Sequence, residues 1–183
     1  ACIKYFGLIP FELGPGIKTG LKINYRNPLE VGADRIANAI AVIERFPKKN
    51  LIVIDFGTAT TFDIVSKDKI YHGGSILPGL QISMEALEQK AAKLPPVEII
   101  RRKKVIGRST MGSIQSGLYF GHRGMVKELI DQISSEAFSN DPPVVVATGG
   151  FSNLYKEDEL FDTIIPELVL QGINIAVNKN MPR

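Results

Sequence analysis

LIVIDFGTATTFDIV, residues 51–65, is the stretch from which we predict the fold. Its first four residues form a short apolar run of the kind that makes a fully buried strand. Gly57 marks a turn, and the residues after it predict a second strand over 60–65. The polar residues 66–69 then turn the chain into a third strand near 70–75. The stretch therefore predicts a β-meander.

Helical periodicity appears on both sides of this meander. Apolar residues recur at the i, i+3, i+4, i+7 spacing of one buried helix face, and prolines stop the first two of these patterns. The predicted helices span residues 34–46, 80–94, 111–137 and 168–177, and a further buried strand spans 144–147. This alternation favours an α/β fold. A meander followed by helices is typical of actin-like or ribonuclease-H-like ATPase domains, although element order alone does not separate them from other α/β folds.

The composition limits the class of protein. The 183 residues are 44% hydrophobic and 22% charged, which is enough apolar sequence for a folded core. Cys2 is the only cysteine, so an internal disulfide is excluded and a cytoplasmic protein is favoured. No apolar run approaches the roughly 18 residues of a membrane span, and we expect no membrane insertion. The basic run at 101–104 lacks interleaved aromatic residues and is interpreted as a solvated face, so we expect no nucleic-acid partner.

The turn of the meander, DFGTATT at residues 55–61, has the composition of a phosphate site. Gly57 lets the backbone approach a phosphate closely, while backbone amides and threonine hydroxyls donate to its oxygens. Asp55 is suited to hold a cation that offsets the phosphate charge. The alternative is an ordinary hairpin, in which the threonines suit a pleated strand and Asp55 accepts hydrogen bonds from turn amides.

A second motif, GADR at residues 32–35, stands at the start of the first predicted helix. Free helix amides and the helix dipole favour an anion there, and Arg35 is able to bind a carboxylate through two hydrogen bonds. Asp34 is positioned to accept a proton from a hydroxyl group. Taken alone, the motif is better explained as a helix start in which Asp34 complements the dipole and Arg35 is a surface charge.

Two other polar positions have structural and functional explanations. Thr110 stands at the start of the predicted helix over 111–137, where capping is the ordinary use of threonine. Gly149 and Gly150 follow the predicted strand over 144–147. They suit either a tight turn or the close approach of the backbone to an adenosine.

In combination, these motifs resemble those of type III pantothenate kinases. Tyr25 and the Asn-Pro pair at 27–28 lead into GADR, and DFGTATT follows about twenty residues later. The similarity continues through GGSILPGL (73–80), STMGSIQSG (109–117) and ATGGFS (147–152). The match runs from about residue 14 to residue 172, and the joint occurrence of GADR and DFGTATT in this order is highly specific.

The resemblance implies an actin-like fold and the ATP-dependent phosphorylation of pantothenate to 4'-phosphopantothenate, the first step of coenzyme A biosynthesis. It implies that Asp34 is the general base that takes the proton from the terminal hydroxyl of pantothenate. Thr110 would reach pantothenate from the neighbouring subunit of a homodimer. The same pocket would be lined by Tyr25, Gly32, Ala33 and Arg35.

The resemblance also implies an ATP site with two kinds of cation. Thr58, next to Gly57 in the turn, would bind the ATP phosphates, which Mg²⁺ accompanies. Asp55 would bind a monovalent cation, K⁺ or NH₄⁺. Gly149 and Gly150 would lie near the adenosine.

The resemblance is incomplete at the start of the chain. The family begins with a strand and hairpin that carry an Asp-x-Gly-Asn-Thr motif for ATP phosphates and magnesium, and nothing before Gly14 resembles it. We therefore predict a remnant of the N-terminal lobe over 1–49, with the substrate-binding GADR helix, and a nearly complete C-terminal ribonuclease-H-like lobe over 50–183. Two alternatives stay open: a non-catalytic pantothenate-binding or scaffold homologue, and an actin-like kinase or phosphatase for another substrate.

Overall fold

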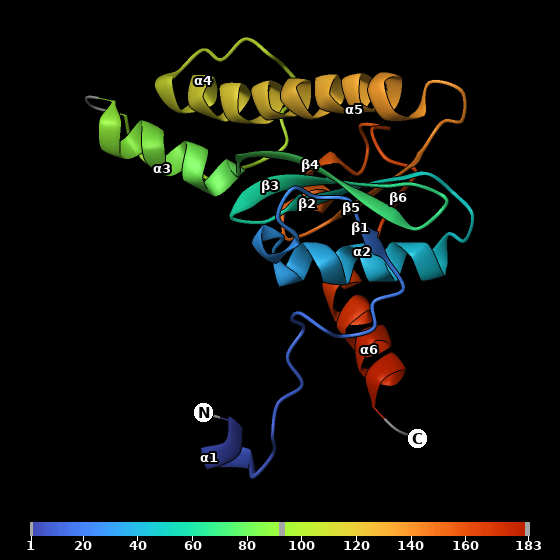
Figure 1. Ribbon diagram of the computed structural model, residues 1–183. Helices are drawn as coiled ribbons and strands as arrows, with labels where there is room; N and C mark the ends of the chain where they lie inside the picture. The colour runs from blue at the N-terminus through green and yellow to red at the C-terminus, as the bar shows by residue number, and fades with distance from the viewer. Residues whose placement is uncertain (1, 92–93, 182–183) are drawn as a thin grey trace.

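The computed structural model describes residues 2–91 and 94–181, and a mixed sheet forms its middle layer (Figure 1). The strands are β1 (Lys22–Ile23), β2 (Leu51–Phe56), β3 (Ala59–Val65), β4 (Ile70–Pro78), β5 (Val144–Thr148) and β6 (Thr163–Ile164). Their order across the sheet is β1-β4-β3-β2-β5-β6. β2, β3 and β4 pair antiparallel as the predicted meander, whereas β5 pairs parallel with β2.

Helices cover both faces of the sheet. The α-helices of the described residues are α1 (Cys2–Phe6), α2 (Ala33–Arg45), α3 (Leu80–Lys90), α4 (Thr110–Ser116), α5 (His122–Phe138) and α6 (Leu168–Asn180). Figure 1 shows α3, α4 and α5 on one face and α2 on the other, with α6 beyond α2. The two largest apolar clusters of the core separate in the same way, because alternate residues of a strand point to opposite faces.

The alternation of β3 divides its side chains between these two layers. Phe62 and Ile64 belong to the cluster under α4 and α5, and Val65 belongs to the cluster over α2. Asp63, which alternates with Phe62, therefore faces α2. Side chains of one short strand thus pack into two different layers, and the carboxylate of Asp63 lies in the layer next to α2.

The predicted elements agree with the structure except at two places. The helix predicted over 80–94 is wrong at its end, because α3 stops at Lys90 and Ala91 is extended with φ −100° and ψ 124°. Residues 92–93 of that prediction lie outside the described residues. The early end has a packing reason, because the segment without regular structure that follows α3 buries Val97 in the core and packs Leu94 against the core.

The helix predicted over 111–137 is interrupted by one π-helical segment. α4 and α5 are joined by a π-helix over Gly117–Gly121. An i to i+5 turn shifts the helix register. Leu118, Tyr119 and His122, within and just after this segment, are all buried.

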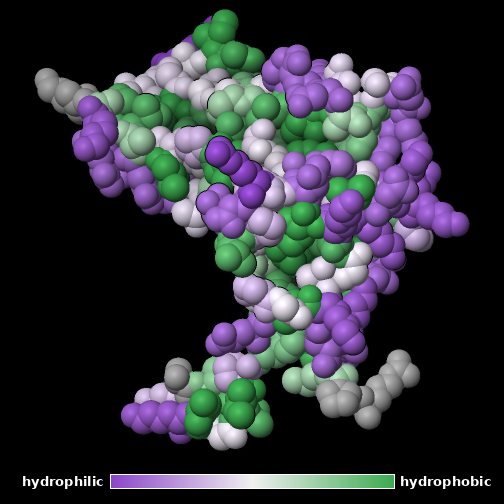
Figure 2. Space-filling model, in the orientation of Figure 1, coloured by the Kyte–Doolittle hydropathy of each residue, from purple (hydrophilic) through white to green (hydrophobic). Residues whose placement is uncertain are grey.

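The first residues stand apart from the layered body. α1 and the segment after it extend away from the sheet (Figure 1), and Figure 2 shows hydrophobic side chains exposed there. Ile9 is 84% exposed and Phe6 is 73% exposed. Within residues 2–91 and 94–181, no helix combines the length and the apolar character that a membrane crossing requires.

Residues on both sides of the predicted lobe boundary at 49/50 contribute to the same sheet and to the same apolar core cluster. β1 pairs parallel with β4, and Val42 of α2 packs with Val53 of β2 in one core cluster. The division into a remnant over 1–49 and a lobe over 50–183 stays a prediction.

Candidate active site

The carboxyl ends of the parallel strands β2 and β5 meet at one edge of the sheet. Asp55, near the end of β2, pairs in register with Thr148 at the end of β5. The first turns of α2 lie beside this edge, because Asn38 of α2 contacts Asp55. Ligands of open α/β sheets bind outside the carboxyl ends of the strands. The edge is therefore the candidate active site.

Asp34 lies exposed in the first turn of α2. Its Oδ1 accepts a hydrogen bond from the backbone amide of Arg35 at 2.8 Å. Gly32, the N-cap residue, leaves room for this carboxylate, since a Cβ there would lie 2.5 Å from the same oxygen. The carboxylate is thus oriented by one hydrogen bond, and its exposure leaves it accessible to a proton donor.

Asp55 lies half-buried beside α2, and its Oδ2 accepts a hydrogen bond from Asn38 Nδ2 at 3.0 Å. Burial raises the pKa of Asp55, the Asn38 hydrogen bond opposes that rise, and the negative charge of Asp34 adds to it. The charge of Asp34 therefore acts on Asp55, although less than burial does.

The surroundings of Asp55 have oxygen donors that suit a hard cation. Asn38 is 1% exposed, and its Oδ1 is buried without a hydrogen-bond partner among the described residues. Within residues 2–91 and 94–181, no three His, Cys, Asp or Glu side chains are grouped so that they could hold a metal ion. Asp55 and the Asn38 carbonyl therefore fit a cation whose other ligands come from backbone, water or substrate.

Gly149 packs directly against Asp55. Its φ is +87°, and a Cβ there would lie 2.4 Å from Asp55 Oδ1 and 2.6 Å from the backbone nitrogen of Phe56. Gly150 has nothing within 4 Å of the corresponding position. The two predicted adenosine glycines therefore differ: Gly149 closes a tight turn against β2, and Gly150 is open to solvent.

The turn between β2 and β3 presents Thr58 at the surface. The backbone of Gly57 donates to the carbonyl of Ala59 at 3.1 Å, and the carbonyl of Thr58 accepts from Gly79 at 3.1 Å. Thr58 itself is exposed. Its hydroxyl is therefore accessible at the end of the hairpin, as a phosphate ligand would require.

Arg35 is buried, so its interpretation as a surface charge is wrong. Its Nε donates to Asp63 Oδ1 at 2.7 Å, and its Nη2 donates to the carbonyl of Phe62 at 3.1 Å. Both nitrogens of the Nε/Nη2 edge of the guanidinium are thus hydrogen-bonded to β3 within the protein. Any carboxylate that Arg35 binds must use the remaining edge.

Asp63 and Tyr71 are site neighbours that the sequence analysis missed. Tyr71 donates its hydroxyl to Asp63 Oδ1 at 2.7 Å, and both residues are fully buried. Burial raises the pKa of Asp63 to about 6, although Arg35 and the Tyr71 hydroxyl act in the opposite direction. The available signal was a carboxylate at an inward position of a predicted buried strand, where a charge requires a partner.

The structure brings most of the predicted site residues to the α2 side of the sheet, but not Thr110. Tyr25 lies half-buried near Tyr71, with ring centroids 6.4 Å apart. Ala33 is exposed at the first position of α2. Thr110 begins α4 on the opposite face of the sheet and is exposed there (Figure 1).

A second polar cluster under the hairpin was also missed. His122 Nε2 lies 3.1 Å from Thr60 Oγ1, and His122 Nδ1 lies 3.0 Å from the Tyr155 hydroxyl. All three side chains are buried, and burial lowers the pKa of His122 to about 4. The β2–β3 hairpin is thus tied to α5 by a neutral imidazole.

His122 makes stability depend on pH in a predictable direction. The unfolded protein binds a proton at His122 below about pH 6.5, whereas the folded protein does not until about pH 4, so stability falls as pH decreases between these values. We expect wild type to be more stable than His122→Gln near neutral pH, and the gap to narrow by about 2 kcal/mol at about pH 5. Urea unfolding of both proteins over this pH range measures the difference between their free energies of unfolding.

The same comparison removes the effect of Asp63. Its raised pKa stabilises the folded state as pH falls through about 6, with the opposite sign, but it is present in both proteins and cancels in their difference. A gap that stays constant from neutral pH to about pH 5 would contradict a neutral buried His122.

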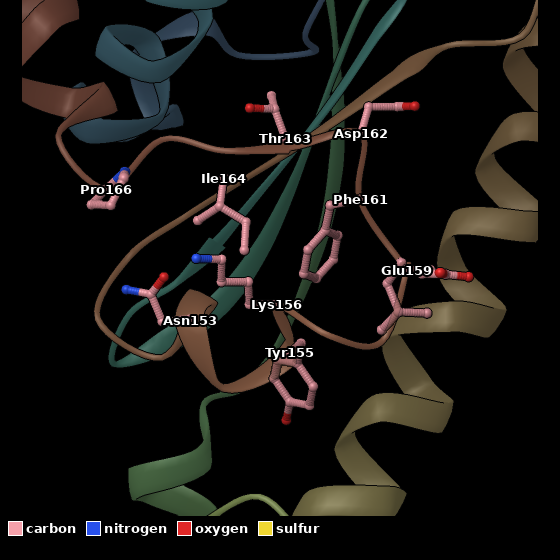
Figure 3. A pocket seen from close by; sticks show the side chains of 10 residues that line it. Asn153, Tyr155, Lys156, Glu159, Phe161, Asp162, Thr163, Ile164 and Pro166 are labelled. Carbon is pink, nitrogen blue, oxygen red and sulfur yellow. The ribbon is translucent and has the colours of Figure 1, made fainter.

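A cavity of about 310 Å³ is lined by residues between 153 and 166, which follow the Gly149–Gly150 turn in the sequence. Figure 3 shows its lining side chains, among them Asn153, Lys156 and Ile164, with the carboxylate of Asp162 pointing away from them. Asp162 Oδ2 accepts a hydrogen bond from the Val145 amide at 2.7 Å. The cavity shares none of its lining residues with the group around Asp34 and Asp55.

A family model described as type III pantothenate kinase matches residues 1–132 of the chain. The chain belongs to the type III pantothenate kinase family. A type III pantothenate kinase from Legionella pneumophila (strain Corby) is 58% identical over 180 residues, which cover 98% of this chain and 70% of that protein. Type III pantothenate kinase 1 from Francisella tularensis subsp. holarctica (strain OSU18) is 49% identical with the same coverage. Membership of this kinase family confirms the predicted phosphotransferase class, for which ATP and a divalent metal are implied.

Two solved structures of other proteins are similar to this chain in fold. A Campylobacter jejuni protein, described as a conserved Baf family transcriptional activator, has a TM-score of 0.61 at 21% identity and covers 86% of this chain and 67% of its own. The Alp12 filament structure has a TM-score of 0.51 at 17% identity, with coverage of 78% and 52%. At these identities the likeness shows the fold alone, and it confirms the predicted actin-like ATPase fold.

Proposed function

We propose that this chain carries the general base, the pantothenate pocket and the cation site for ATP-dependent phosphorylation of pantothenate, the first step of coenzyme A biosynthesis. The observation that carries the proposal is the placement of Asp34. Its carboxylate is exposed and oriented at the carboxyl end of the sheet, where it interacts electrostatically with Asp55. Kinases need a base at the acceptor hydroxyl and charge compensation at the phosphates.

In the proposed reaction, the terminal hydroxyl oxygen of pantothenate attacks the γ-phosphorus of ATP. Asp34 takes the hydroxyl proton, and the bond between the γ-phosphorus and the bridging oxygen breaks, so that ADP leaves with that electron pair. Mg²⁺ bound to ATP supplies charge neutralisation for the transferred group. The contribution of the chain is to orient the acceptor hydroxyl against an exposed carboxylate.

The hairpin end supports the assignment of the ATP phosphates and the monovalent cation. Thr58 offers an accessible hydroxyl, and Gly57 leaves the backbone uncovered beside it. Asp55, with the unpaired Asn38 oxygen, is our proposed site for K⁺ or NH₄⁺. We place the adenosine beyond the Gly149–Gly150 turn.

We further propose a homodimer in which Thr110 completes the pantothenate site of the other subunit. Thr110 lies on the opposite face of the sheet from Asp34, which supports a contribution in trans rather than within one chain. A cytoplasmic location, and a lobe boundary at 49/50, remain part of this proposal. No observation favours the non-catalytic scaffold or another substrate.

Pantothenate-dependent release of ADP by the full gene product tests the proposed function. With ATP, Mg²⁺ and K⁺ present, we expect turnover that requires pantothenate and falls when Na⁺ replaces K⁺. Omission of pantothenate is the control for ATP hydrolysis. Absence of pantothenate-dependent turnover from a folded sample would favour the scaffold alternative.

A further inference from the structure

Three side chains from three elements form a closed, buried cluster directly behind Asp34. Arg35 of α2 donates through Nε to Asp63 Oδ1 of β3 at 2.7 Å, and Tyr71 of β4 donates its hydroxyl to the same oxygen at 2.7 Å. The Arg35 guanidinium also lies over the Tyr71 ring, 5.9 Å from its centroid. Asp63 is thus the shared acceptor of the cluster.

Stability alone does not account for this cluster. Asp63 is 0% exposed, and its Oδ2 has no hydrogen-bond partner among the described residues. A buried ion pair is commonly no more stable than apolar side chains of the same volume, and an unpaired buried oxygen adds a further cost. Such a pair does fix one arrangement of its members, because moving either one exposes an uncompensated charge to the core.

The cluster extends to Tyr25 through β4. A β-bulge between Ile64 and Val65 pairs Val65 with Tyr71 and Ile64 with Gly73. Gly73 has φ +94°, and a Cβ there would lie 2.9 Å from Tyr25 Cε2, so the Tyr25 ring rests on the bare backbone of Gly73. Tyr71, whose hydroxyl binds Asp63, and Gly73, whose backbone contacts the Tyr25 ring, thus lie two residues apart on β4, next to the bulge.

We propose that Asp63 is a positioning residue of the pantothenate site. It holds the Nε/Nη2 edge of Arg35, so that the other edge is presented to the substrate carboxylate, and it fixes Tyr71 and with it the strand on which Tyr25 rests. This inference rests on the proposed function, because it names what sets the geometry of that same pocket. Asp63 itself is buried and does not touch the substrate.

Asp63→Asn is the direct test, measured by steady-state kinetics of the full gene product. We expect the KM for pantothenate to rise about tenfold or more, the range for loss of a charged hydrogen bond. The KM for ATP should stay within about twofold, because the hairpin end is not part of the cluster. Asp141→Asn is the matched control: this exposed carboxylate pairs with Lys67 at 2.9 Å and lies beside Asn50, which follows the C-terminal end of α2, and the change should leave both constants unchanged.

A substrate lacking the carboxylate separates positioning from general damage. In the amide analogue of pantothenate, the carboxylate that Arg35 would bind is absent, so Asp63→Asn should act on it only through Tyr71 and Tyr25 and should raise its KM by a smaller factor than the KM for pantothenate. An equal loss of affinity for pantothenate, the amide analogue and ATP would overturn the inference.

Tyr71→Phe keeps the test decisive if Asp63→Asn does not fold. It removes one hydrogen bond and leaves the ion pair, so the protein should keep its fold while the KM for pantothenate rises about threefold to tenfold. An unchanged KM in folded Tyr71→Phe, or in folded Asp63→Asn, would overturn the inference and leave the proposed function intact. A wild-type protein that does not turn over pantothenate would instead overturn the proposed function, and the inference with it.

Discussion

Asp34→Asn is expected to lower the kcat of pantothenate phosphorylation by about 10²- to 10⁴-fold, the usual contribution of a general base. The amide has the shape of the carboxylate but cannot accept the hydroxyl proton. The side chain lies exposed in the first turn of α2, where its Oδ1 accepts only the Arg35 amide among the hydrogen bonds described. Substitution by asparagine should therefore leave the fold intact.

The kinetic signature of this variant distinguishes a base from a binding group. A lost base lowers kcat and kcat/KM together, whereas a lost binding contact raises KM with little change in kcat. Asp131→Asn is a suitable control, because Asp131 is also an exposed carboxylate on a helix, and among the described residues its one ion pair is with Lys127 at 2.5 Å. Turnover of Asp34→Asn within a few-fold of wild type would remove Asp34 from its proposed role.

The sequence predicted the elements well because their signals are local. The helix from 34 to 46 and the meander follow from periodicity and turn residues that act over a few positions. The end of α3 was missed because Leu94 and Val97 reach the core from a segment without regular structure, which periodicity alone does not reveal. The π-helical segment over Gly117–Gly121 has no simple sequence signal, and periodicity alone predicted one continuous helix over 111–137.

The candidate site was only partly predictable, because its decisive contacts are between residues distant in sequence. Arg35 meets Asp63, 28 positions later, and this pairing changes a presumed surface charge into a buried partner. Thr60 meets His122, 62 positions later. Motif spacing identified Asp34 and Asp55, but it contains no information about which side chains pack behind them.

Gly149→Ala should be the most damaging single change at the end of β5. The residue has φ +87°, which an alanine adopts only with strain, and the new Cβ would lie 2.4 Å from Asp55 Oδ1 and 2.6 Å from a backbone nitrogen that has little freedom to move. We expect the free energy of unfolding to fall by about 2 to 4 kcal/mol. Because Asp55 must shift, the KM for ATP and the response to K⁺ should also worsen, by about tenfold.

The neighbouring Gly150→Ala variant is the matched comparison for this prediction. It adds the same methyl group one residue later, where nothing lies within 4 Å, so its free energy of unfolding should stay within about 0.5 kcal/mol of wild type. Urea unfolding of the two variants, followed by ADP-release kinetics for each folded protein, measures both effects. If the two alanines destabilised the protein equally, the contact between Gly149 and Asp55 would not be what shapes this edge of the sheet. A difference of several kcal/mol would instead show that the positive φ of Gly149 and its close packing against Asp55 and Phe56 require a glycine directly after β5.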